Sequence, residues 1–190
     1  FGLFRARPDP EVPAIWVHAV SVGETLAAVP LLESLLRDYP AYRIVLTTTT
    51  PTGSERVRAL FGHRVFHVYA PWDLPGPLRR FLRRTRPRLL LLMETELWPN
   101  MLHYSRAAGC RVVLANARLS ARSARGYARL PGLTRDLLRG LDVAACQSAA
   151  DSERFLALGL LPAATAVTGN IKFDLAIAPE LRERAAALQQ

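Results

Sequence analysis

Cysteine and long apolar runs are scarce in this chain of 190 residues. Its two cysteines, Cys110 and Cys146, are too few for a disulfide framework or a cysteine-built metal site, and they favour a reducing compartment. No stretch approaches the ~18 apolar residues of a membrane-spanning helix, and the longest aliphatic run, residues 89–93, suits a buried strand. The four histidines are scattered, without the spacing of metal ligands. We therefore expect neither a disulfide scaffold nor a metal centre.

Negative charge is in deficit. The formal net charge is +9 and the pI about 10.7, and Lys172 is the only lysine among the 25 basic residues. Half of the residues are apolar and the mean hydropathy is +0.09, which excludes a disordered or collagenous chain. A basic surplus of this size favours an anionic partner, such as nucleic acid, acidic lipid or a phosphorylated substrate.

Short β-branched runs alternate with amphipathic helical patterns along the whole chain. This alternation predicts an α/β fold in which helices cover both faces of a parallel sheet. Pro30 interrupts the first helical pattern, so we expect a kink there, or a separate first turn that presents Gly23 and Glu24. The expected strands are residues 15–20, 43–49, 65–69, 88–93, 111–115, 143–146 and 164–167.

Polar segments follow most of the expected strands, where ligands bind in an open α/β sheet. They include residues 21–24, 94–100, 116–120 and 168–170. The segment 47–54 is rich in hydroxyls and could cradle an anion at the start of the next helix. It is not a P-loop, because no lysine follows its glycine, and no G-x-G-x-x-G follows the first strand. The pattern predicts a polar crevice and does not favour a nicotinamide dinucleotide site.

Glu24 falls in the first turn of the helix that follows the first strand, just after Ser21 and Gly23. The helix dipole favours an anion there, so one interpretation is a capping carboxylate. The other is a general base at the crevice, with a pKa tuned for proton abstraction. His18, in the first expected strand, is interpreted as a core residue close to Glu24.

Glu94 and Glu96 follow a strand that we expect to be central and buried. If that strand continues, both side chains point to one face of the sheet. They are then either structural acceptors for backbone N–H groups and arginines, or the paired carboxylates of a retaining or inverting hydrolase. Their spacing leaves both interpretations open.

Six arginines crowd into residues 79–88, on a helix that also carries Leu78, Phe81 and Leu82. Such a helix is either solvated or a surface for anionic lipid or phosphate. No nucleic-acid partner is favoured, because the aromatic residues are not interleaved at stacking positions. The arginines are Arg79, Arg80, Arg83, Arg84, Arg86 and Arg88.

Five sequence blocks together resemble the 3-deoxy-D-manno-octulosonic acid (Kdo) transferases of lipopolysaccharide assembly. They are HAVSVGE at 18–24, TTTTPTGSE at 47–55, METELWPN at 93–100, NARLS at 116–120 with Arg122 and RGY at 125–127, and TGNIKFD at 168–174. The blocks occur in the family's order, cover nearly the whole chain and are highly specific as a set. The resemblance implies the N-terminal half of a GT-B glycosyltransferase, in which two Rossmann-like halves face each other across a cleft.

The resemblance also implies an organisation and a location. Residues 1–170 would form the acceptor-binding domain, a Rossmann-like doubly wound parallel sheet. Residues 171–190 would form the crossover and the start of a C-terminal donor-binding domain. The family has an N-terminal hydrophobic anchor, which would lie upstream of Phe1 and hold the protein at the cytoplasmic face of the bacterial inner membrane.

By the same likeness, Kdo passes from CMP-Kdo to the 6′-hydroxyl of lipid IVA, the lipid A precursor, with inversion and without a cofactor or metal. Glu24 matches the family's proposed catalytic base, and Glu96 matches the second acidic block. Phosphate groups of lipid IVA and the membrane surface would face Arg79, Arg80, Arg83 and Arg84. The implied acceptor-binding residues are Ser21, Gly23, Thr50, Glu94, Arg118, Ser120 and Arg122, and the implied donor-binding residues are Gly169, Asn170 and Lys172.

Two other functions compete with this one. The first is another GT-B nucleotide-sugar enzyme, either a different sugar transferase or an epimerase. The second, for this chain taken alone, is a non-catalytic domain that binds anionic lipid, because half of the active site would be absent.

Overall fold

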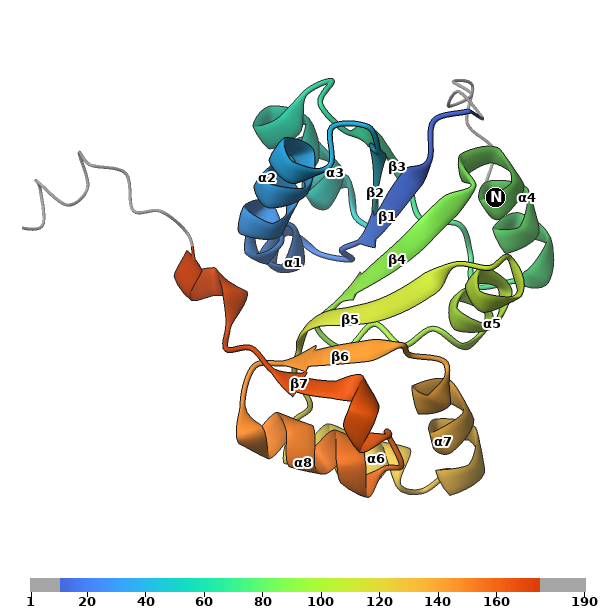
Figure 1. The fold of residues 1–190 in the computed structure, drawn as a ribbon, viewed down its shortest axis with the longest axis vertical. Coiled ribbons are helices and arrows are strands. Elements are labelled where there is room, and N and C mark those ends of the chain that lie inside the picture. The colour runs from blue at the N-terminus through green and yellow to red at the C-terminus, as the bar shows by residue number, and fades with distance from the viewer. Residues whose placement is uncertain (1–10, 175–190) are drawn as a thin grey trace, which may run out of the picture.

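Seven parallel strands form one sheet in the computed structural model, which describes residues 11–174 (Figure 1). Their order is β3-β2-β1-β4-β5-β6-β7, so the chain builds outward from the centre in one direction and then, after β3, in the other. This is the doubly wound α/β sheet that the sequence predicts, and all seven expected strands are present within two residues of their expected bounds. The strands are β1 (Ala14–His18), β2 (Arg43–Thr48), β3 (Phe66–Tyr69), β4 (Pro87–Met93), β5 (Arg111–Ala117), β6 (Val143–Cys146) and β7 (Thr165–Val167).

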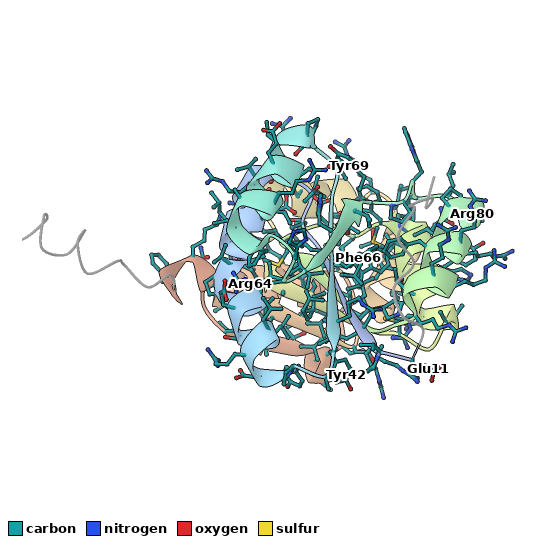
Figure 2. The ribbon with its side chains drawn as sticks, turned by 90° about the horizontal axis from the view of Figure 1, so that it is seen from above. Glu11, Tyr42, Arg64, Phe66, Tyr69 and Arg80 are labelled. Carbon is teal, nitrogen blue, oxygen red and sulfur yellow. The ribbon has the colours of Figure 1, made fainter. Side chains whose placement is uncertain are left out.

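Helices cover both faces of the sheet (Figure 2). On one face α1, α2 and α3 pack on β1 and β2, and on the other α4, α5, α7 and α8 pack on β4, β5 and β6. Figure 2 shows the two layers from above, with Arg64 and Arg80 on opposite sides. The helices are α1 (Val22–Ala27), α2 (Val29–Asp38), α3 (Pro51–Phe61), α4 (Pro75–Thr85), α5 (Pro99–Ala107), α6 (Ala121–Tyr127), α7 (Pro131–Arg139) and α8 (Ala149–Ala157), with 3-10 turns η1 (Pro162–Ala164) and η2 (Ile171–Asp174).

The central strands are buried on both faces, which explains their continuous apolar sequence. In β1, Trp16 joins the core under α4 and α5, whereas Val17 joins the core under α1 and α2. In β4, Leu92 and Met93 divide in the same way. This two-residue alternation across a strand places the two cores on opposite sides of one sheet.

Pro30 explains why the first helical pattern divides into two helices. Helix α1 ends at Ala27, and Pro30 then occupies one of the first two positions of α2, where its missing N–H has no intrahelical acceptor to lose. The expected separate first turn is therefore present, and it carries Gly23 and Glu24.

One sequence expectation needs correction. Strand β4 ends at Met93, and Glu94 adopts a left-handed φ of 55°, so Glu94 and Glu96 do not share a strand face. Trp72 is 64% exposed, whereas Cys110 and Cys146 are buried. Most of the expected crossover segment, residues 175–190, lies outside the described residues. Within residues 11–174, no helix is both long enough and apolar enough to cross a bilayer.

Candidate functional site

The carboxyl ends of β1 and β4 lie side by side at the centre of the sheet. From β1 the chain continues into α1 on one face, and from β4 it continues into α5 on the other. Such a reversal of winding leaves a crevice between the two connections, which is where open α/β sheets bind ligands. The segments that follow β1 and β4 carry Glu24, Glu94 and Glu96. We call these three carboxylates, which border the crevice, the acidic rim.

Glu24 is held by three local hydrogen bonds. The Val20 backbone N–H donates to Oε2 at 2.8 Å and the Ser21 hydroxyl donates to Oε1 at 3.0 Å. In return, Ser21 Oγ accepts the Glu24 backbone N–H at 3.3 Å, as the N-cap of α1. The capping interpretation is therefore correct as a description of the contacts. It fixes the carboxylate without neutralising it, because Glu24 forms no ion pair with any residue between 11 and 174.

Burial raises the pKa of the Glu24 carboxyl above its ordinary value. The Val20 N–H opposes this shift, while the charges of Glu96 and Glu94 add to it. Glu24 is only 9% exposed. A buried carboxylate with a raised pKa accepts a proton more readily than a solvated one, which is the property required of a general base.

Glu96 receives one strong hydrogen bond, from the indole Nε1–H of Trp98 at 2.7 Å. The Trp98 ring in turn meets the His18 ring edge to face, with 5.1 Å between centroids. His18 is buried, as expected, and burial lowers the pKa of its imidazole to about 4. Glu96 is therefore linked to the core beneath the crevice through two aromatic side chains.

Glu94 is the carboxylate of the rim that has cationic partners. Lys172 Nζ lies 3.2 Å from Oε1 and Arg118 Nη2 lies 3.8 Å from Oε2. These contacts bring together residues from the ends of β4 and β5 and from the segment after β7. Three residues that the sequence assigns to acceptor and donor binding are thus neighbours.

Asn116, at the end of β5, is a residue that the sequence analysis missed. It is buried, has a left-handed φ of 52°, and its Oδ1 accepts the backbone N–H of Ile171 at 3.1 Å. Asparagine is among the few residues that tolerate this backbone conformation, and that preference was the available signal. Together with the ion pair between Lys172 and Glu94, Asn116 fastens the segment after β7 to the acidic rim.

The other predicted binding residues lie in the segments that follow β2 and β5, with varied contacts. Thr50 Oγ1 accepts Gly53 N–H at 3.1 Å and Ser120 Oγ accepts Ser123 N–H at 3.0 Å, so both hydroxyls cap helices. The exposed side chain of Arg122 lies in the first turn of α6.

Three further predicted binding residues, Gly23, Gly169 and Asn170, differ in how strongly the local structure requires their residue type. Gly23 is exposed, and a Cβ there would meet only Ser21 Oγ at 3.8 Å, so packing within the domain does not require glycine. Gly169 has a φ of 83°, which favours glycine. Asn170 Oδ1 accepts the Lys172 backbone N–H at 3.0 Å.

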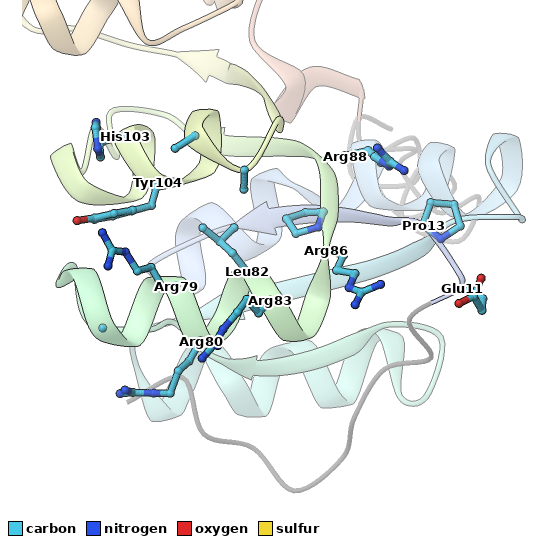
Figure 3. Close-up of a pocket in the computed structure, with 14 residues that line it drawn as sticks. Glu11, Pro13, Arg79, Arg80, Leu82, Arg83, Arg86, Arg88, His103 and Tyr104 are labelled. Carbon is cyan, nitrogen blue, oxygen red and sulfur yellow. The ribbon is translucent and has the colours of Figure 1, made fainter.

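The arginine-rich helix α4 borders a broad pocket of about 1250 Å³ between α4 and α5 (Figure 3). Arg79, Arg80 and Arg83 line it, whereas Arg84 does not. Arg79 lies over the Tyr104 ring, with 4.9 Å from Cζ to the centroid. The pocket extends to Arg86 and Arg88, which flank the amino end of β4, so it reaches the edge of the sheet opposite the acidic rim.

A second pocket, of about 500 Å³, is apolar and was not foreseen from the sequence. Its lining includes Leu97, Tyr127, Leu130, Leu133 and Leu137, and Leu130 and Leu133 are 61% and 51% exposed. The spacing of the last three leucines, at three and four residues, was the available signal. The pocket adjoins the acidic rim, because Leu97 follows Glu96 and because burial and the charge of Glu96 raise the pKa of Tyr127. We call it the apolar groove.

Comparison with known proteins assigns the chain to a family. A family model described as 3-deoxy-D-manno-octulosonic-acid transferase (kdotransferase) matches residues 1–175. The 3-deoxy-D-manno-octulosonic acid transferase of Haemophilus influenzae is 42% identical over 189 residues, which cover 100% of this chain and 44% of that protein. The protein of the same name from Bordetella pertussis is 44% identical over 191 residues, covering 97% and 43%. The chain thus spans less than half the length of these relatives.

Solved structures show the same fold at low sequence identity. A UDP-GlcNAc 2-epimerase from Neisseria meningitidis, bound to UDP-GlcNAc, superposes with a TM-score of 0.63 and 13% identity, over 92% of this chain and 53% of that one. A second UDP-N-acetylglucosamine 2-epimerase gives a TM-score of 0.62 and 13% identity, over 91% and 55%. The fold class predicted from the sequence is confirmed: the chain has the architecture of one half of these GT-B-like enzymes.

Proposed function

The chain belongs to the Kdo transferase family, and on that premise we propose that the whole protein moves Kdo from CMP-Kdo to lipid IVA, with inversion, in lipopolysaccharide biosynthesis. The observation that carries the proposal is the acidic rim at the carboxyl ends of β1 and β4, built from residues of the family's own sequence blocks. Residues 1–170 act as the acceptor-binding domain, and a C-terminal domain that begins after the crossover completes the donor site.

In this mechanism Glu24 is the general base. As the bond between the anomeric carbon and the CMP phosphate oxygen breaks, the acceptor's 6′-hydroxyl oxygen bonds to that carbon from the opposite face. Glu24 takes the hydroxyl proton, and CMP leaves with the bonding electron pair. The hydrogen bonds from Val20 and Ser21 keep the carboxylate in position for this step, and assistance by such a base is typically worth about 10²–10⁴-fold in rate.

Glu96 is the second catalytic carboxylate, and its charge favours proton uptake by Glu24. Lys172 serves the donor, together with Gly169 and Asn170, by placing a cation where the CMP phosphate departs. The contact between Lys172 and Glu94 supports this role, since it sets the cation at the acidic rim before the donor binds.

The acceptor is a phosphorylated, acylated sugar, and the surface beside the rim matches each part of it. Arg118, Ser120 and Arg122 take phosphate and sugar oxygens, while Ser21, Gly23, Thr50 and Glu94 border the reacting hydroxyl. The apolar groove begins beside Glu96 and takes an acyl chain, because its exposed leucines have no apolar cover within residues 11–174.

We call the arginine-lined pocket between α4 and α5 the basic pocket. In the proposal it faces the cytoplasmic leaflet of the inner membrane, to which a segment upstream of Phe1 anchors the protein. Each basic residue near an anionic surface contributes about 1 kcal/mol. Arg79, Arg80, Arg83 and Arg84 are therefore the proposed membrane contacts. This surface lies on the layer formed by α4 and α5, so contact there leaves the carboxyl edge of the sheet accessible.

The deciding experiment is mass spectrometry of lipid IVA after incubation of the full-length protein with CMP-Kdo. We expect the acceptor to gain the mass of one or more Kdo residues and CMP to be released in equal number. A parallel incubation with UDP-sugars separates the other GT-B enzymes: turnover of a UDP-sugar, with no change in lipid IVA, would overturn the proposal. Binding of anionic vesicles without turnover of any donor would favour a lipid-binding domain.

A further inference from the structure

Trp98 is the one aromatic side chain that bonds to the acidic rim among residues 11–174. Its indole Nε1–H donates to Glu96 Oε2 at 2.7 Å, a short distance for a hydrogen bond from nitrogen. A hydrogen bond from a neutral donor to a carboxylate contributes more to stability than a hydrogen bond between two neutral groups. It also fixes the direction in which the carboxylate oxygen points, which a mobile cation would not do.

The backbone of Trp98 is fixed from the side of α5. Trp98 is the N-cap of that helix, with φ −90° and ψ 119°, and Pro99 occupies the first helical position. Its side chain makes no capping bond, so the indole is left available to Glu96. Proline favours an extended backbone in the residue before it, which restricts the direction in which the Trp98 side chain leaves the backbone.

The ring of Trp98 is fixed from the core side. The His18 ring meets it at 77°, and His18 Nδ1 shares a hydrogen bond of 2.9 Å with Thr47 Oγ1. Thr47 Oγ1 also accepts the Trp16 indole N–H at 2.8 Å. All three of these supporting residues are fully buried. The indole therefore rests on a rigid core contact and not on a mobile surface side chain.

His18 has a second property that points to Trp98. Its Nε2 is buried and has no hydrogen-bond partner among the described residues. An orphaned ring nitrogen is expensive in a core, so a packing reason must keep imidazole there. The edge-to-face contact with Trp98, with 5.1 Å between ring centroids, supplies one.

We propose that Trp98 is a positioning residue that holds the Glu96 carboxylate beside Glu24, with His18 as the support beneath it. This inference rests on the proposed function and adds to it a residue that touches neither substrate nor the reacting hydroxyl. The charged groups that act on Glu24 are Glu96 and Glu94, and Glu94 is itself paired with Lys172 and Arg118. Within residues 11–174 Glu96 forms no ion pair, and Trp98 is its hydrogen-bond donor, so its placement depends on the indole.

The test uses full-length Trp98→Phe, which keeps an aromatic ring against His18 but lacks the N–H. We expect kcat to fall about tenfold, the effect of losing one hydrogen bond to a charged group, with KM for CMP-Kdo within twofold of wild type. The acidic limb of the kcat profile should move to lower pH, because a displaced Glu96 no longer raises the pKa of Glu24. Trp72→Phe, the same change at an exposed position, should alter none of these values.

A double-mutant cycle with Glu96→Gln separates positioning from folding. If Trp98 acts through the Glu96 charge, adding Trp98→Phe to Glu96→Gln should change kcat less than twofold and leave the acidic limb unmoved. Additive losses in the cycle, or an unmoved limb in Trp98→Phe alone, would overturn the proposal.

A second measurement does not depend on activity. In protein labelled with ¹⁵N-tryptophan, the Trp98 indole N–H should exchange slowly in wild type and at least tenfold faster in Glu96→Ala, which has no side-chain acceptor, with Trp72 unchanged. An equal exchange rate in both proteins would refute the hydrogen bond itself. If the wild-type protein transfers no Kdo but the exchange difference is observed, the proposed function is wrong and the contact between Trp98 and Glu96 is still supported.

Discussion

The acidic rim and the basic pocket lie at opposite ends of the same sheet, and they hold their charges in different ways. At the rim, Glu24 is held by Val20 and Ser21, Glu96 by Trp98, and Glu94 by Lys172 and Arg118. In the pocket, the side chains of Arg83, Arg86 and Arg88 form no ion pair with any residue that the structure describes.

This difference separates two kinds of task. A proton transfer requires an acceptor fixed within a fraction of an ångström, and short hydrogen bonds to backbone and core residues supply that precision. A charged lipid surface presents phosphates at no fixed positions, so long unpaired side chains suit it better. The contrast predicts large, specific effects from small changes at the rim and graded, salt-dependent effects from changes in the pocket.

The largest expected effect is that of Glu24→Gln in the full-length protein. Glutamine keeps the shape of the side chain but cannot take a proton from the acceptor, so kcat should fall by about 10²–10⁴-fold. Glu55→Gln, the same change at an exposed position of α3, should leave kcat unaltered. Wild-type turnover by Glu24→Gln, measured by release of CMP, would show that Glu24 is not the base. It would also contradict the distinction between a precisely held acidic rim and an adaptable basic pocket.

The pH dependence of the same variant sharpens the result. Because the pKa of Glu24 is raised, the folded state binds its proton more tightly than the unfolded state does. Its contribution to stability is therefore greatest at low pH and declines as the pH rises through the unfolded and then the folded pKa. Kdo transfer should be lost as the pH falls through the same range, at a higher pH than for an ordinary glutamate. In chemical unfolding, Glu24→Gln should abolish the part of the pH dependence of stability that Glu24 contributes.

The second effect concerns the core beneath the rim. The pKa of His18 is lowered to about 4, so between pH 6.5 and 4 the folded state holds fewer protons than the unfolded state. The free energy of unfolding should fall by roughly 3 kcal/mol as the pH drops through this window. His18→Gln should flatten that dependence and the exposed His63→Gln should not. Parallel curves for His18→Gln and wild type, in urea unfolding at several pH values, would contradict a rigid core support.

The third effect concerns the pocket. Reversing Arg83 and Arg86 to glutamate should weaken binding to anionic vesicles at least about tenfold at low salt, and much less at high salt. Reversing Arg56 and Arg58, on exposed positions of α3, changes the net charge equally and should have a smaller effect. If flotation of vesicles shows equal losses for the two pairs, net charge alone governs binding and the pocket has no special role.

The smallest effect concerns Asn116. Asn116→Ala should lower the free energy of unfolding by about 1–2 kcal/mol, because alanine resists the left-handed backbone and leaves Ile171 N–H without its acceptor. Asn116→Gly should recover part of the loss, since glycine adopts this φ freely. Equal stability of the two variants in thermal unfolding would show that backbone conformation is not what asparagine provides here.

The sequence predicts the sheet well because its signals are local. Each strand has its own short apolar run, and Pro30 marks a helix break that a single residue can specify. The polar segments after the strands are also local, so Ser21, Glu24 and Lys172 could be placed at one edge by counting strands alone.

What the sequence did not indicate depends on contacts across long separations. The pairing of Glu94 with Lys172 joins residues 78 positions apart, and the contact of His18 with Trp98 joins the end of β1 to the segment between β4 and α5. The left-handed turn at Glu94 invalidated the expectation that two glutamates share a face, because strand alternation ends where the backbone leaves the extended region. The apolar groove was missed because it forms only where Leu97, from the segment after β4, and Tyr127 of α6 meet the leucines of α7.

The fastening of η2 has a mechanical consequence. Ile171 and Lys172 are bonded to Asn116 and Glu94, so η2 is held against the acidic rim. In the proposed two-domain protein, a movement of the second domain would therefore act on the ion pair between Lys172 and Glu94. The relative position of the two domains and the charge around the reacting alcohol would then change together.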